Sequence, residues 1–153
     1  DKVSVNTAFF KTPDVIESAA QIFGSQALIA CIDYRLVDDS PTVFINKGLE
    51  KIDGRLVDWA KKAEELGCGE IFLHAIERDG TAQGYDLKTI HAVTESVTIP
   101  VIACGGAGHQ SHFKKCFESS NASAIAAGNI FHFTENAYPR AKSYLRNHIK
   151  DIR

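Results

Sequence analysis

Polar residues and glycines follow the short apolar runs of this 153-residue sequence, where they could bind a ligand or do chemistry. They are an amide, two carboxylates and two glycine turns, at Asn6, Asp33, Asp79, Gly105 and Gly128. Spacing alone leaves two interpretations of each carboxylate, because an aspartate at a strand end often only caps the next helix. The glycines are more specific, since glycine lets backbone N–H groups approach an anion closely. The first chemistry that the sequence indicates is therefore phosphate binding.

The two glycine turns follow the last two apolar runs. One is Gly-Gly-Ala-Gly at positions 105–108, and the other is Gly-Asn at positions 128–129. A glycine-rich turn after a strand suits a phosphate held by backbone donors at a helix N-terminus, although chain geometry alone can also require glycine. In barrels of parallel strands, a phosphate site recurs in the loops after the last two strands. The pairing of the two turns favours a phosphate site over a purely geometric role.

The apolar runs alternate with amphipathic stretches, which is the pattern of repeated strand–helix units around a parallel sheet. Strands are predicted at 3–7, 27–33, 71–75, 100–104 and 124–127, and helices at 12–24, 55–66, 86–97, 111–118 and 138–150. The long connection 35–54 is predicted to hold a small hairpin around 42–45. In a parallel α/β barrel, the active site lies beyond the carboxyl ends of the strands. We therefore predict one domain over residues 1–153, with five strand–helix units that bring the candidate residues together.

Composition narrows the class of protein. The chain is 44% hydrophobic and 24% charged, with a net charge of -2, which is an ordinary balance for a globular domain and provides no basic stripe for nucleic acid. No apolar run approaches the roughly 20 residues needed to span a bilayer, so a cytoplasmic location is expected. The four cysteines have no close pairing, which argues against a metal site or a disulfide framework and predicts reduced, mostly buried thiols. No cofactor, metal, nucleic-acid or membrane partner is predicted.

Eight short motifs, in family order, resemble the cyclase subunit of imidazole glycerol phosphate synthase, a family of histidine biosynthesis. The resemblance covers nearly the whole chain and implies a TIM-type barrel of (βα) units. The first strand here corresponds to the fourth of the family's eight, so the sequence would hold a partial barrel of about five units, strands four to eight, without strands one to three. The motifs are DKVSVNTA at 1–8, FGSQ at 23–26, ID at 32–33, GCGEI at 67–71, RDGT at 78–81, GYD at 84–86, IPVIA at 99–103 and FHF at 131–133.

The resemblance implies an ammonia-dependent cyclase, a lyase that acts on an elongated substrate with a phosphate at each end. Such a cyclase takes ammonia from a glutaminase partner through the barrel and releases imidazole glycerol phosphate and an aminoimidazole carboxamide ribotide. Two aspartates act as acid and base, and Asp33 matches one of them. The other belongs to the first strand, which this sequence is expected to lack. A paired proton transfer needs both groups, so little activity is expected of the isolated chain.

The resemblance also assigns roles to further residues. Asn6 and Asp79 match positions that line the reaction centre. The matches to backbone positions around the phosphates are Gly80, Gly105, Gly106, Gly128 and Asn129. At the opposite end of the barrel, Lys2 and Glu70 match a charged ring at the ammonia entrance, whereas without the resemblance they are two solvated charges at strand starts.

Departures from the family pattern gather near the substrate, at His74, Cys104 and Asn129. They support a second hypothesis, a paralogue in which a similar barrel and glutaminase deliver ammonia for sugar amidination. His74 and His132 could be ligands or bases, but a satisfied structural histidine is predicted for both. A third hypothesis is a non-catalytic half-barrel that binds phosphate and forms a homo-oligomer, because an open parallel sheet exposes unpaired backbone groups and an apolar inner face.

Overall fold

Alternation of side chains along β2 (Leu28–Val37) shows how the sheet is built. Leu28, Ala30 and Ile32 are buried, whereas the residues between them, such as Cys31 and Asp33, are half-buried. Successive side chains of a strand point to opposite faces, so one face of the sheet packs against helices and the other stays open. The computed structural model describes residues 1–133, 135, 137–149 and 152.

Within the described residues, the strands form one sheet of seven, in the order β4-β3-β2-β5-β6-β7, with β1 also paired to β2. The pairs β1–β2, β2–β5, β5–β6 and β6–β7 are parallel, and the pairs β2–β3 and β3–β4 are antiparallel. The sheet does not close, so the chain is a partial, unclosed barrel, as predicted. The other strands are β1 (Val3–Val5), β3 (Ser40–Ile45), β4 (Glu50–Ile52), β5 (Glu70–Ala75), β6 (Val101–Cys104) and β7 (Ala124–Ala126).

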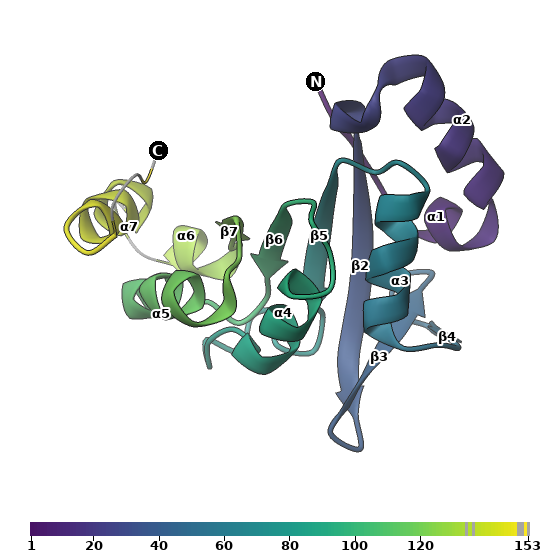
Figure 1. Cartoon of the computed structure of the whole chain (residues 1–153). Coiled ribbons are helices and arrows are strands. Elements are labelled where there is room, and N and C mark those ends of the chain that lie inside the picture. The colour runs from purple at the N-terminus through teal and green to yellow at the C-terminus, as the bar shows by residue number, and fades with distance from the viewer. Residues whose placement is uncertain (134, 136, 150–151, 153) are drawn as a thin grey trace.

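Helices follow the parallel strands and cover the buried face of the sheet. Figure 1 shows α3, α4 and α5 on the same side of the strands, and α3 contacts β2 while α4 contacts β6. Parallel neighbours need such crossover connections. The helices are α1 (Thr7–Lys11), α2 (Pro13–Phe23), α3 (Leu56–Glu65), α4 (Leu87–Thr94), α5 (Gln110–Ser120), α6 (Asn129–Phe133) and α7 (Ala137–Arg146), with a 3-10 turn η1 (Ser25–Ala27).

Several elements differ from the sequence prediction: α1 and α6 were not predicted as helices, the last helix ends at Arg146, and two strands have other ends. The strand expected to end at Asp33 continues to Val37, because its second half pairs with β3 in the predicted hairpin. The two residues between these strands, Asp38 and Asp39, have φ values of 49° and 59°, which is the backbone of a tight type I′ turn. The first strand ends at Val5 rather than at residue 7, since α1 begins at Thr7.

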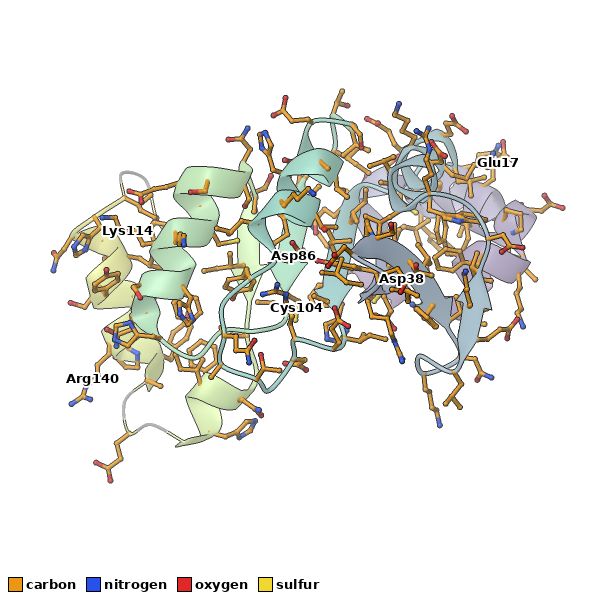
Figure 2. All side chains as sticks on the ribbon, turned by 90° about the horizontal axis from the view of Figure 1, so that it is seen from below. Glu17, Asp38, Asp86, Cys104, Lys114 and Arg140 are labelled. Carbon is orange, nitrogen blue, oxygen red and sulfur yellow. The ribbon has the colours of Figure 1, made fainter. Side chains whose placement is uncertain are left out.

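The core holds α3 and α4 against the sheet. Phe9, Phe10 and Trp59 form an edge-to-face aromatic cluster, with the rings of Phe10 and Trp59 4.9 Å apart. Tyr34, fully buried on β2, donates a hydrogen bond from its hydroxyl to Asp86 Oδ2 at 3.3 Å. Asp86 is the N-cap of α4, and Figure 2 places it near the middle of the molecule, between Glu17 and Arg140 at the two ends.

The structure can be compared with the predictions about the thiols and about membrane-spanning segments. All four cysteines are free, and Cys68 and Cys116 are buried while Cys31 and Cys104 are half-buried. In the described part of the chain, no helix is long and apolar enough to cross a membrane.

Candidate active site at the carboxyl ends of the strands

An aspartate, a histidine and a cysteine stand side by side across three parallel strands. The register pairs Asp33 on β2 with His74 on β5, and His74 with Cys104 on β6. All three alternate with buried neighbours, so they share the open inner face of the sheet. The row lies near the carboxyl ends of β5 and β6, where active sites of parallel barrels are found.

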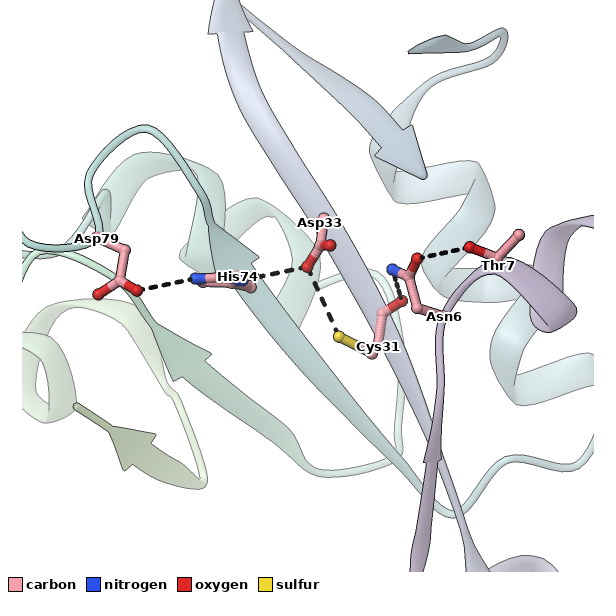
Figure 3. Close-up of polar contacts among 6 residues, drawn as sticks. All are labelled: Asn6, Thr7, Cys31, Asp33, His74 and Asp79. Carbon is pink, nitrogen blue, oxygen red and sulfur yellow. Dashed lines mark hydrogen bonds and ion pairs between the residues drawn. The ribbon is translucent and has the colours of Figure 1, made fainter. Parts of the chain in front are cut away.

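His74 lies between two carboxylates, as Figure 3 shows. Its Nδ1 is 3.1 Å from Asp33 Oδ1, a hydrogen-bond distance, and its Nε2 is 3.6 Å from Asp79 Oδ2. The second distance suits an ion pair but is too long for a hydrogen bond, and the buried Nε2 has no hydrogen-bond partner among the described residues. The satisfied structural role predicted for His74 is therefore wrong at this atom, and the side chain belongs to the candidate site.

The carboxylates raise the pKa of His74 above its ordinary value of 6.5. The hydrogen bond that the ring donates to Asp33 is the largest cause, burial opposes it, and the charges of Asp33 and Asp79 add to the rise. Burial raises the pKa of the Cys31 thiol to about 12, with a contribution from Asp33, and that of Cys104 to about 11, with a contribution from Asp79. Both thiols are therefore protonated at neutral pH and unsuited to act as nucleophiles.

Asn6 is held beside Asp33 by the backbone of the next strand. Its Nδ2 donates to the carbonyl oxygen of Cys31 at 3.0 Å, and its Oδ1 accepts from Thr7 Oγ1 at 3.3 Å. The Cys31 thiol in turn donates to Asp33 Oδ1 at 3.6 Å. The structure thus brings Asn6, Asp33 and Asp79 to the same end of the sheet, as the sequence predicted.

The loops after β5, β6 and β7 meet beside this group. Gly84 N–H donates to the carbonyl of Gly106 at 2.7 Å, and the Tyr85 hydroxyl donates to the carbonyl of Ala126 at 2.9 Å. A Cβ on Gly80 would lie 2.8 Å from Asn129 Nδ2, so these two residues approach closely. The glycines and the asparagine predicted around a phosphate therefore form one group of adjoining loops.

The glycines of this group have different local environments. Gly105 and Gly106 have φ values of 102° and 100°, and a Cβ on Gly105 would lie 2.5 Å from the carbonyl oxygen of Ala75. Gly128 borders open space, because apart from Gly128 and its two chain neighbours no described residue has an atom within 4 Å of the position that a Cβ would take there. The first two glycines are thus required by the turn itself, and the third borders free space in which a ligand could lie.

Comparison with known proteins gives the family of this chain. Residues 1–137 match the family model described as histidine biosynthesis protein. The chain belongs to the histidine biosynthesis protein family.

The chain is similar to the HisF subunit of imidazole glycerol phosphate synthase from several bacteria. It is 44% identical over 154 residues to HisF of Hydrogenobaculum sp. strain Y04AAS1, covering 100% of this chain and 61% of that protein. Identity is 44% over 146 residues to HisF of Prosthecochloris aestuarii and 45% over 150 residues to HisF of Clostridium botulinum strain Langeland, each covering 95% of this chain and 58% of the relative. The chain therefore spans about 60% of the length of these relatives.

Other residues that were predicted from the sequence of this family member lie away from the group around Asp33. Lys2 and Glu70 form a partly exposed ion pair at the starts of β1 and β5, the end of the sheet opposite to Asp33. His132 is exposed on α6, so the structural role predicted for it is not seen among the described residues. A separate, mostly apolar cavity of about 540 Å³ lies between α5, β7 and α7, lined by residues that include Phe113, Phe131 and Leu145.

Sequence reasoning missed two members of the site. Thr7 and Cys31 contact Asn6 and Asp33, yet neither was a candidate. Cys31 stands two residues before Asp33 on the same strand, so the period of two in a β-strand places both side chains on one face. That alternation was the available signal for Cys31. Among the described residues, no three His, Cys, Asp or Glu side chains converge to hold a metal ion.

Proposed function

We propose that this chain is the part of an ammonia-dependent imidazole glycerol phosphate cyclase that carries one acid–base carboxylate, Asp33, and the phosphate loops. The observation that carries the proposal is the position of Asp33. It lies within β2 rather than at the start of a helix, with only 17% of its side chain exposed and with His74 beside it. A role as a helix cap is therefore excluded, and a carboxylate on the inner face at this end suits proton transfer.

The similarity to HisF subunits supports the choice of reaction. In this proposal Asp33 exchanges a proton with the substrate while Asn6 and Asp79 line the reaction centre. Backbone N–H groups around Gly80, Gly105, Gly106, Gly128 and Asn129 bind a phosphate of the substrate. In this proposal the second acid–base carboxylate lies on strands outside residues 1–153, so these residues alone turn over little substrate.

The proposed partner is a glutaminase subunit that supplies ammonia at the opposite end of the sheet. The relatives are named as subunits of a synthase, which supports a partner of this kind. In this proposal the Lys2–Glu70 ion pair is part of the entrance for ammonia, and the complex acts in the cytoplasm.

Supplying the missing strands tests the proposal. The chain would be combined with the part of Hydrogenobaculum HisF that precedes the matched region, and ammonia-dependent formation of imidazole glycerol phosphate would be measured. Asp33→Asn should lower the rate about 10²- to 10⁴-fold. Asp38→Asn is the matched control, because Asp38 lies in the exposed turn after the same strand and should leave the rate unchanged.

A second candidate is the paralogue that delivers ammonia for sugar amidination, and His74 favours it. Its imidazole occupies the space between Asp33 and Asp79, where the cyclase family usually has a small polar residue. An assembled, folded barrel that stimulates the glutaminase but forms no imidazole glycerol phosphate would favour this candidate over the cyclase.

The open inner face favours a third candidate, the phosphate-binding half-barrel that forms a homo-oligomer. The apolar side chains of Ile29, Phe72 and Ile102 on this face are only half-buried. A second copy would cover them if the inner faces met. Light scattering that finds a dimer at micromolar concentration would support this candidate, and a monomer that binds no apolar dye would exclude it.

A further inference from the structure

His74 is the one side chain of the described site that reaches both carboxylates. It stands on β5 between Asp33, its lateral neighbour on β2, and Asp79, four residues after β5 ends. Its Nδ1 lies 3.1 Å from Asp33 Oδ1 and its Nε2 lies 3.6 Å from Asp79 Oδ2. The ring therefore spans the gap between the two residues that the proposed reaction uses.

The chemistry of imidazole decides which form of His74 fits this position. A neutral ring has one N–H donor and one acceptor nitrogen, whereas the imidazolium donates from both nitrogens. Carboxylate oxygens face both nitrogens of His74, so a neutral ring would set a nitrogen lone pair against an oxygen lone pair. Only the protonated ring presents an N–H to each carboxylate, and the raised pKa of His74 agrees with this geometry.

The two carboxylates differ in their freedom to move. The Asp33 side chain is 17% exposed and stands within a strand, and the Cys31 thiol also donates to it. The Asp79 side chain is 48% exposed and stands in the loop between β5 and α4. When the ring loses a proton, the contact with Asp33 is therefore kept and the contact with Asp79 is lost.

The charged side chains that follow Asp33 on β2 and His74 in the loop after β5 make other contacts. Arg35 donates to the carbonyl of Gly48 at 2.7 Å, Arg78 donates to the carbonyl of Gly84 at 3.3 Å, and Glu77 accepts from the backbone of Leu36 at 2.8 Å. The thiols on the flanking strands, Cys31 and Cys104, are protonated at neutral pH. The charges that face His74 within the described site are thus those of Asp33 and Asp79.

We propose that His74 is a positioning residue that holds Asp33 and Asp79 together as an imidazolium, so that Asp79 is fixed toward the reaction centre only while the ring is protonated. Gly80 follows Asp79 and lies against Asn129, so the same proton also sets the position of the loop that adjoins the phosphate site. The effect on catalysis rests on the proposed cyclase function, whereas the bridge that His74 forms between Asp33 and Asp79 does not.

Nuclear magnetic resonance of the isolated chain tests the bridge without any substrate. The His74 ring and the backbone amides of Asp79 and Gly80 would be followed as pH is raised. The amides should shift with the same midpoint as the ring. The midpoint of the ring should fall in Asp33→Asn and, by less, in Asp79→Asn.

Two variants separate positioning from packing. In His74→Asn the amide nitrogen replaces Nδ1 and keeps the contact with Asp33, whereas in His74→Gln it replaces Nε2 and keeps the contact with Asp79. Both should lose the pH-dependent shift of the Asp79 and Gly80 amides while the chain stays folded. The proposal is overturned if these amides in His74→Asn still shift with the midpoint of the wild-type ring, or if Asp33→Asn leaves the His74 midpoint in place. Failure of the cyclase assay would leave this result untouched.

Discussion

Nδ1 of His74 lies 3.1 Å from Oδ1 of Asp33, one strand away, in a site where only about a quarter of the imidazole is exposed. Because the pKa of His74 is raised above 6.5 in the folded chain, the fold binds the proton more tightly than the unfolded chain does. The pair therefore stabilises the fold fully below pH 6.5, and this contribution is lost as pH rises through the folded-state pKa.

Urea unfolding at a series of pH values checks the sign of this linkage. The stability advantage of the wild type over His74→Asn should be largest below about pH 6.5 and should shrink at higher pH. Gln83→Asn, an exposed change that involves no ionisable group, is the control and should show no such trend. An advantage that grows with rising pH would contradict the raised pKa.

Thiol reactivity reports the charge of Asp33. Because Asp33 contributes to the raised pKa of Cys31, Asp33→Asn should lower that pKa and speed alkylation of Cys31 by iodoacetamide at pH 8. Cys68 is the internal control, since burial alone raises its pKa to about 11. Peptide mass spectrometry separates the sites, and equal acceleration at both cysteines would indicate general loosening of the fold instead.

The glycine turns should respond differently to an added methyl group. Gly106→Ala forces a left-handed backbone onto alanine and drives its Cβ into the carbonyl of Gly84, so it should cost at least about 2 kcal/mol of unfolding free energy. Gly128→Ala meets open space and should cost less than about 1 kcal/mol. Urea unfolding compares the two variants. Titration with inorganic phosphate should show weaker binding by Gly128→Ala, and unchanged binding would remove Gly128 from the phosphate site.

The contact between Tyr34 and Asp86 links β2 to α4. Asp86→Ala removes the N-cap, whose side chain accepts from Thr89 N–H at 3.3 Å. It also leaves the buried Tyr34 hydroxyl without its acceptor. The expected loss of stability is about 2 to 4 kcal/mol, as the sum of a cap and an unsatisfied polar group. Tyr34→Phe keeps the cap and should cost about 1 kcal/mol. Thermal or urea unfolding that ranks the two variants in the opposite order would show that the cap contributes little.

The Lys2–Glu70 ion pair should matter little to stability. Both side chains are partly exposed, so Lys2→Ala should change the unfolding free energy by less than about 1 kcal/mol, and by less still at high salt. If the pair belongs to the ammonia entrance, the same variant should impair glutamine-driven turnover of the assembled enzyme more than turnover driven by free ammonia. Equal loss with both ammonia sources would argue against that role.

The order of the elements could be predicted from sequence because the periodicity of the apolar residues agrees with the proline and glycine residues that mark the ends of elements. Pro13 and Gly24 frame α2 as predicted, and the continuous apolar run at 27–32 identifies the first half of β2. The course of β2 past Asp33 could not be predicted from its apolar run, because the antiparallel partner β3 extends the strand through polar residues. The short helix α1 was not predicted, because Asn6 and Thr7 continue the alternation of β1.

The site could be predicted only as far as single residues. Asn6, Asp33 and Asp79 were placed correctly at one end of the sheet, because parallel strands end together. The role of His74 depends on lateral register across β2 and β5, and register is a property of the folded sheet. Its contact with Asp79 further depends on the path of the loop after β5, which no local sequence pattern predicts.

The tight turn between β2 and β3 bears on the order in which the site assembles. A two-residue turn joins strands that pair locally, whereas the parallel partners of β2 lie tens of residues away along the chain. Local hairpins close in microseconds, and distant pairs must first overcome the entropy of closing long loops. We therefore expect the backbone around Asp33 to be ordered by the hairpin before His74 arrives on β5. Strengthening this turn should then speed folding more than strengthening any contact of the imidazole.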